Sequence, residues 1–283
     1  MTGRRVVLLI VRFAGASRLN AVATILVALV ALVALLGPWL APHPPEAMSL
    51  AERLQPPSAA HPLGTDDFGR DLLSRVLSGA RISVEVAAVV LSLSVALGVI
   101  LGAFAGLAGG LVDEVLMRVT DLFLAFPVLI LAAAIAATLG GNLTTTVIAL
   151  AAVYWPWYAR LVRGQVLSLR EREYILASRA FGASPWWLVR EHLLPNVLAL
   201  VIVQVSLDIG YVILATSSLS FLGLGAQPPT PEWGAMLVAA RAYIRDGWWF
   251  ATFPGIALAM TVFAFNLAGD GLRDWLDPRL HGR

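Results

Sequence analysis

Few of the residue types that carry catalysis are present in this 283-residue sequence. It has no cysteine, and all 20 of its basic residues are arginine. Thiol nucleophiles, cysteine-ligated zinc, lysine Schiff bases and a P-loop, which needs a lysine at the phosphates, are therefore excluded. The sequence suggests no Ser/His/Asp arrangement that could meet in space. The histidines are scattered, and we expect no metal-ligand cluster among them: His43, His61, His192 and His281. We therefore expect a non-catalytic chain with no metal and no cofactor of its own.

One carboxylate lies inside an otherwise apolar stretch, residues 201–213. Asp208 is at its centre, and Gln204 lies four residues earlier, on the same face of a helix. A charged side chain at the centre of a bilayer costs about 2.5–3.5 kcal/mol on insertion scales. Asp208 should therefore face protein or a water-filled path. It either lines a translocation path and meets a cationic substrate, or makes a structural hydrogen bond to a neighbouring subunit.

A second polar segment carries arginines and small residues. Residues 169–174 (LREREY) are too charged to enter lipid, and the following helix should break at Gly182 and restart with Ser184 as N-cap and Pro185 at its first position. A bend of small residues lets another protein approach closely, and Phe181 could fill an apolar groove there. The alternative is an amphipathic connector that rests on the membrane. The expected contact residues are Ala177, Ser178, Arg179, Ala180, Phe181, Gly182, Ala183, Ser184 and Pro185.

The composition indicates that lipid surrounds the elements that carry these residues. The chain is 59% hydrophobic and 13% charged, whereas soluble domains are about 45–50% apolar and about 25% charged. Spanning a bilayer takes about 20 mostly apolar residues. The sequence thus predicts an all-α integral membrane protein with six transmembrane helices, at residues 21–40, 84–107, 122–139, 143–161, 197–219 and 250–267. The first is expected to be a retained anchor rather than a cleaved signal peptide, and a turn at 140–142 should join the third and fourth.

The arginines predict the orientation of these spans. Cytoplasmic segments carry an excess of basic residues, and placing the N-terminal segment 1–20 inside puts fourteen of the 20 arginines on the cytoplasmic side. Both termini and the loop 164–196 are then cytoplasmic. On the outer side, 43–63 is a proline-rich linker. Thr65 could cap a short amphipathic helix, with Asp66 and Asp67 favouring its N-terminal dipole, before the second span.

The bend segment resembles the coupling loop of binding-protein-dependent ABC importer permeases. Their pattern is Glu-Ala-Ala, three residues, Gly, nine residues, then Ile-x-Leu-Pro; Ala177, Gly182, Leu194 and Pro195 fit it. Leu176, Ser178 and His192 depart from it, so any interaction of the family glutamate is in doubt. The resemblance extends over nearly the whole chain. Three other segments resemble the peptide/nickel permease family: 61–71 (HPLGTDDFGRD), 220–229 (SFLGLGAQPP) and 266–278 (NLAGDGLRDWLDP).

The resemblance implies a fold, partners and a location. The fold would be the six-helix bundle of type I importers, within a permease domain at 21–283, in the inner or plasma membrane of a prokaryote. The partners would be a second, homologous permease, two ABC ATPases that bind the ATP, an external substrate-binding protein and the lipid bilayer, with no nucleic acid. We expect Gly182→Val to uncouple transport by filling the bend, without preventing insertion.

The substrate class stays open between di- or oligopeptides and a nickel or other metal chelate. Residues 176–179 and 207–210 look closer to nickel permeases. Two other classes of protein are weaker alternatives. A membrane enzyme would be active as an isolated chain, and a secondary transporter would show inverted repeats and ion-coupled uptake without an ATPase.

Overall fold

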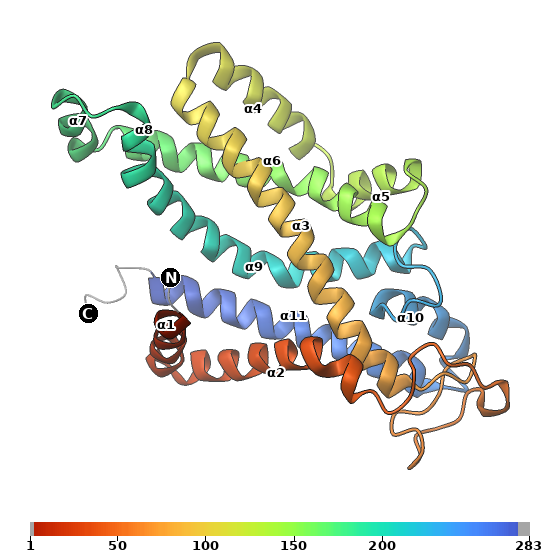
Figure 1. Ribbon diagram of the computed structural model, residues 1–283. Coiled ribbons are helices and arrows are strands. Elements are labelled where there is room, and N and C mark those ends of the chain that lie inside the picture. The colour runs from red at the N-terminus through yellow and green to blue at the C-terminus, as the bar shows by residue number, and fades with distance from the viewer. Residues whose placement is uncertain (1–2, 277–283) are drawn as a thin grey trace.

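The computed structural model describes residues 3–276, and every regular element in that range is helical (Figure 1). Short 3-10 turns follow α2 and α10 (η1, Leu50–Glu52; η3, Arg241–Tyr243), and a π-helical turn precedes α9 (η2, Val189–Leu193). The α-helices are α1 (Gly3–Ala16), α2 (Arg18–Leu40), α3 (Leu72–Ala108), α4 (Gly110–Leu124), α5 (Val128–Thr138), α6 (Leu143–Arg170), α7 (Glu173–Ala180), α8 (Pro185–Leu188), α9 (Leu194–Phe221), α10 (Trp233–Ala240) and α11 (Trp248–Leu276).

Four helices of the described chain are long and apolar enough to cross a membrane. They are α2, α3, the continuous helix Val189–Phe221 and α11, and the pair α4 and α5 makes a fifth if it counts as one span. The prediction of an all-helical membrane protein is therefore confirmed. The structure supports four to five spans rather than the expected six.

The expected third span at 122–139 is wrong as a straight helix. Helices α4 and α5 meet at 89°. Phe126 and Pro127 lie at the junction, and α5 begins only at Val128. Proline lacks the N–H that would continue the hydrogen-bond ladder, and its ring clashes with the preceding turn. Residues 122–139 are apolar, as predicted. At Pro127, however, the chain turns sharply between two helices instead of kinking within one.

The second span is longer than expected and absorbs the predicted amphipathic helix. Helix α3 has 37 residues and begins at Leu72. Its N-cap is Asp71, whose carboxylate accepts the Ser74 N–H at 2.8 Å. Thr65 was expected to cap a helix here, but instead it pairs with Asp71 in a short antiparallel bridge and donates its hydroxyl to the Glu52 carbonyl.

Helix α6 is the least apolar of the long helices. Its 28 residues would span about 42 Å at 1.5 Å per residue. Asn142 forms a capping box with Thr145 at its start, as the predicted turn at 140–142 requires. Three glycines of α3 pack against α6, because a Cβ at Gly98, Gly102 or Gly106 would overlap its atoms.

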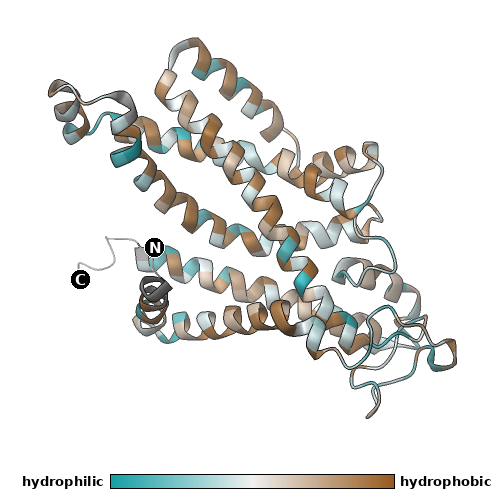
Figure 2. Cartoon of the chain, viewed as in Figure 1, coloured by the Kyte–Doolittle hydropathy of each residue, from teal (hydrophilic) through white to brown (hydrophobic). Residues whose placement is uncertain are grey.

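The bundle has two distinct ends (Figure 1). Helices α7 and α8, α1 and the end of α11 lie at one end. The loop between α2 and α3, the α5–α6 hairpin and α10 lie at the other. Apolar residues run along α2 and α9, whereas the loop between α2 and α3 is largely hydrophilic (Figure 2). The chain therefore has the layout of a membrane bundle with one polar face at each end.

Candidate functional site

The predicted bend is present, and its geometry explains the glycine. Helix α7 ends at Ala180, and Gly182 has φ +83°, in the left-handed region. The Ala183 N–H reaches back to the Ser178 carbonyl at 3.0 Å. This is the Schellman arrangement, in which a left-handed residue just past the helix lets later N–H groups satisfy its last carbonyls. Glycine is favoured at that position because it has no Cβ to strain the backbone.

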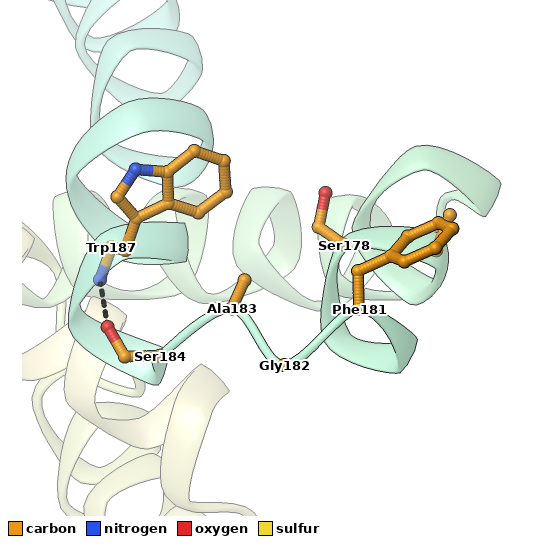
Figure 3. A pocket seen from close by; sticks show the side chains of 7 residues that line it. Ser178, Phe181, Gly182, Ala183, Ser184 and Trp187 are labelled. Carbon is orange, nitrogen blue, oxygen red and sulfur yellow. Dashed lines mark hydrogen bonds between the residues drawn. The ribbon is translucent and has the colours of Figure 1, made fainter.

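A new helix begins after the bend, as predicted. Ser184 accepts the Trp187 N–H on its hydroxyl at 3.2 Å and the Leu188 N–H on its carbonyl at 3.1 Å (Figure 3). Pro185 is the first residue of α8. The π-helical turn η2 then leads into α9 without a break. The bend is thus joined rigidly to a helix that runs the length of the bundle.

An open pocket of about 540 Å³ lies at the bend. In Figure 3, Trp187 lies near one end of the short turn that contains Gly182 and Ala183, and Phe181 and Ser178 lie at its other end. Phe181 is 93% exposed, the highest exposure among the large apolar side chains of the described chain. The side chains of Arg179 and Pro185 lie outside the described part. The remaining lining residues are Ala177 and Ser184.

The bend segment is fixed to the bundle by aromatic and apolar contacts. His192 lies edge-on between Tyr174 of α7 and Trp187 of α8, with ring centroids 5.4 and 5.1 Å apart. Ile175 is fully buried. The bend is therefore anchored to its own bundle and presents an exposed phenyl ring beside an open pocket.

Three arginines of α6 have a role that the sequence did not indicate. Arg163 makes two hydrogen bonds to Asp113, one of them 2.6 Å long, and Arg160 pairs with Asp121. Arg170 donates to the Gly106 carbonyl at 3.1 Å. These contacts tie α6 to α3 and α4 over at least 39 residues of sequence. The basic residues that predicted orientation also hold the bundle together beside the bend.

The partly buried carboxylate of Asp208 is hydrogen-bonded within this chain. Asp208 accepts the Tyr158 hydroxyl of α6 at 2.6 Å and the Gln204 amide of α9 at 3.0 Å. Gln204 and Asp208 do share one helix face, as their spacing predicts. Tyr158 was not foreseen, because it lies 50 residues away and nothing in its local sequence marks it.

The histidines are not all scattered. His43 and His61 lie with ring centroids 4.9 Å apart, and both face Asp71. The expectation that no histidines cluster is therefore wrong for this pair. His192 lies at the opposite end of the bundle, and His281 falls outside the described residues.

Comparison with known proteins agrees with this geometry. Residues 98–282 match the family "Binding-protein-dependent transport system inner membrane component", and residues 16–57 match the "N-terminal TM domain of oligopeptide transport permease C". The chain is 46% identical over 267 residues to the "Probable D,D-dipeptide transport system permease protein DdpC" of Escherichia coli (strain K12), covering 94% of this chain and 90% of the relative.

Two further relatives are similar over most of their length. The "Nickel transport system permease protein NikC" of Escherichia coli (strain K12) is 46% identical, covering 91% of this chain and 93% of the relative. The "Di/tripeptide transport system permease protein DppC" of Pseudomonas aeruginosa (strain UCBPP-PA14) is 45% identical, covering 89% and 85%. The chain is a helical bundle with an exposed bend at one end, and these matches cover nearly all of its length. It therefore belongs to the binding-protein-dependent ABC permeases of the oligopeptide permease C type, which are non-catalytic, multi-pass inner-membrane components of transport systems.

Proposed function

We propose that this chain forms half of the transmembrane path of an ABC importer and receives the motion of an ATPase at Gly182. The exposed Phe181 beside the open pocket is the observation that carries this proposal. A partner surface would cover the ring, and its movement would pass through η2 into α9, which carries Asp208. Coupling of this kind requires two states of the bundle that differ in their contacts at the bend.

The proposed complex has the partners that such a path requires. A homologous second permease completes the path, two ATPases bind the ATP, and a substrate-binding protein delivers cargo at the end where α10 lies. The chain itself holds no ATP. We propose six crossings, with α6 as the sixth in addition to the four straight spans and the bent α4–α5 pair. Residues 1–20 and the loop 164–196 would be cytoplasmic, as would both termini.

We further propose that the cargo is a di- or oligopeptide or a nickel chelate. The named relatives transport substrates of both kinds by their descriptions. Asp208 and Gln204 are the polar groups that would meet a cationic cargo, since both are only partly buried. Tyr158 would hold the Asp208 carboxylate in position.

Coupling at the bend is tested by Gly182→Val in the reconstituted complex. A valine at φ +83° is strained whatever space surrounds it, so the bend should shift while the spans insert normally. We expect substrate uptake to be lost. Gly140→Val is the matched control, because Gly140 also has a positive φ and open space around it but lies at the opposite end. Wild-type uptake by a normally inserted Gly182→Val protein would contradict the proposal.

The apolar contact is tested separately by Phe181→Ala. This change should leave folding intact, because the ring is almost fully exposed, and should weaken copurification of the ATPase. Phe104→Ala removes a half-exposed ring from α3 and serves as the control. If the Phe181→Ala protein bound the ATPase as wild type does, the phenyl ring would have no role in ATPase binding.

The substrate class is tested by the ATPase rate in nanodiscs that hold both permeases, the ATPases and the binding protein. Stimulation by dipeptides or by nickel–histidine identifies the cargo, and Asp208→Asn is then compared with wild type. We expect the variant to lower stimulation by the active cargo. A variant that inserts normally and is stimulated like wild type would place Asp208 outside the path.

A further inference from the structure

Two histidines and a carboxylate meet at the end of the bundle opposite the bend. His43 follows α2, His61 lies in the loop before α3, and Asp71 is the N-cap of α3. One possible ligand atom from each lies within 4.8 Å of the other two. Their sequence separations are 18 and 10 residues, so the fold and not the local sequence brings them together.

Hydrogen bonds hold the three groups in place. Asp71 Oδ1 lies 2.9 Å from His61 Nδ1. Asp71 Oδ2 accepts both the backbone N–H and the hydroxyl of Ser74, at 2.8 and 2.7 Å. The Ser74 hydroxyl in turn accepts the backbone N–H of His43 at 3.1 Å. The histidine backbone and the carboxylate are thus fixed to one another through Ser74.

One atom of the cluster lacks a partner. His43 Nδ1 is buried and has no hydrogen-bond partner among the described residues. It faces Asp71 Oδ2 at 3.9 Å, beyond hydrogen-bond distance. A buried polar atom without a partner is unfavourable, because it has lost its bonds to water without replacing them. The arrangement therefore leaves an imidazole nitrogen aimed at a carboxylate, with nothing between them in the chain itself.

We propose that His43 Nδ1, His61 Nδ1 and the Asp71 carboxylate bind a divalent transition-metal ion of the zinc class. Zinc is bound at about 2.0–2.2 Å by imidazole and carboxylate, so its tetrahedral ligands lie about 3.4 Å apart. His61 Nδ1 lies 2.9 Å from Asp71 Oδ1 and His43 Nδ1 lies 3.9 Å from Asp71 Oδ2, and all three groups offer a ligand atom within 4.8 Å of the others. An ion would replace the hydrogen bond between His61 and Asp71 and draw His43 toward the carboxylate. Three protein ligands leave a fourth position for water.

The surroundings of the cluster fit a metal site. Ligating histidines commonly donate their second ring N–H to a carboxylate, which fixes the tautomer. Glu52 Oε1 lies 3.8 Å from His61 Nε2, so an acidic group faces the second ring nitrogen from beyond hydrogen-bond distance. Ser74 supports the Asp71 carboxylate with two hydrogen bonds. The ligand set contains only nitrogen and oxygen, which suits zinc, nickel or copper better than magnesium or calcium.

The bound ion would join three segments that are otherwise held by hydrogen bonds: the chain after α2, the loop at residues 52–65 and the start of α3. The site does not depend on the proposed function, because the geometry lies within this chain alone.

The test uses the full chain, purified in detergent through a tag without histidines. Zinc binding is measured by equilibrium dialysis with elemental analysis. We expect one saturable Zn²⁺ per chain and a higher melting temperature with Zn²⁺ than without. His43→Ala should weaken binding at least tenfold. His192→Ala, at the opposite end, is the matched control and should bind like wild type.

His43→Ala should fold, because its side chain is 42% exposed and makes no hydrogen bond among the described residues. Ser74→Ala is the second variant, and loss of this supporting hydrogen bond should weaken Zn²⁺ binding by about 10–100-fold. Co²⁺ provides an optical check, since a tetrahedral ion without thiolate absorbs in the visible range and the band should vanish in His43→Ala. Absence of saturable Zn²⁺ binding, or equal binding by wild type, His43→Ala and His192→Ala, would overturn the proposal.

Discussion

Asp67 shows how a single side chain in the loop before α3 sets a pH dependence. Its Oδ1 is buried without a hydrogen-bond partner among the described residues, and its nearest cation, Arg70 Nη2, is 3.7 Å away. Arg70 instead donates its Nε–H to Asp66 at 2.6 Å. Burial, and next the charge of Asp66, raise the pKa of Asp67 above its ordinary value of 3.8. The folded chain therefore binds this proton more tightly than the unfolded chain does.

The sign of the effect follows from that difference. Stability falls as the pH rises from 3.8 through the raised pKa, because the unfolded chain releases the proton first. We expect Asp67→Asn to remove this loss, so its melting temperature at neutral pH should exceed that of wild type and the difference should shrink toward pH 4. Asp246→Asn, on an exposed segment of the same end, is the control. A constant offset at every pH would contradict the assignment.

Gly182 illustrates what local sequence predicts at the residue scale. The pattern Gly-Ala-Ser-Pro placed the helix end and restart correctly, because capping and turn chemistry are local. Within this chain a Cβ at Gly182 would meet nothing within 4 Å, so it is the left-handed φ that favours glycine. That a side chain there would fill the bend against a partner protein stays a prediction. The φ angle of Gly182 depends on how α8 packs against the bundle, and sequence spacing does not reveal that packing.

At the scale of elements, the contact between α3 and α6 depends on close approach of their backbones. A Cβ on Gly102 would overlap the Ala159 carbonyl oxygen and lie 3.0 Å from the carbonyl carbon, and one on Gly98 would lie 2.8 Å from the Trp155 carbonyl oxygen. Small residues commonly allow such approach between membrane helices. Gly98, Gly102 and Gly106 are four residues apart and lie on one face.

We expect Gly102→Ala to destabilise the bundle by about 1–3 kcal/mol, the usual range for overpacking. Gly164→Ala in α6 is the matched control, because a Cβ there meets nothing within 4 Å, and it should be neutral or stabilising by up to about 1 kcal/mol. Thermal unfolding in one detergent measures both. Equal stability of the two variants would show that the helices separate easily and that the glycines do not set their distance.

Element boundaries were harder to predict than element composition. The apolar runs identified the regions of α2, α3, α9 and α11, because hydropathy is a sum over neighbours. The break at Pro127 and the start of α3 at Asp71 were missed, since each depends on which partners the freed backbone groups find. The pairs Arg163–Asp113 and Tyr158–Asp208 join residues 50 apart and leave no local signal.

On the scale of the whole molecule, segments that the arginines predict to be on one side of the membrane also lie at one end of the bundle. The bend, α1 and the end of α11 share one end of the bundle (Figure 1), and these are the segments whose arginines predict a cytoplasmic position. The loop with His43 and His61 lies at the other end. If the bend meets an ATPase, then the histidine cluster faces the opposite compartment.

This orientation can be tested directly because the chain has no cysteine. Phe181→Cys and Ala59→Cys each introduce a single thiol at an exposed position, one at each end of the bundle. We expect a membrane-impermeant maleimide to label Ala59→Cys in spheroplasts and Phe181→Cys only in inside-out vesicles, because basic segments are retained in the cytoplasm. Labelling in detergent confirms that both thiols react. If Phe181→Cys reacts from outside, the bend lies in the wrong compartment for an ATPase, and both the orientation and the proposed coupling fail together.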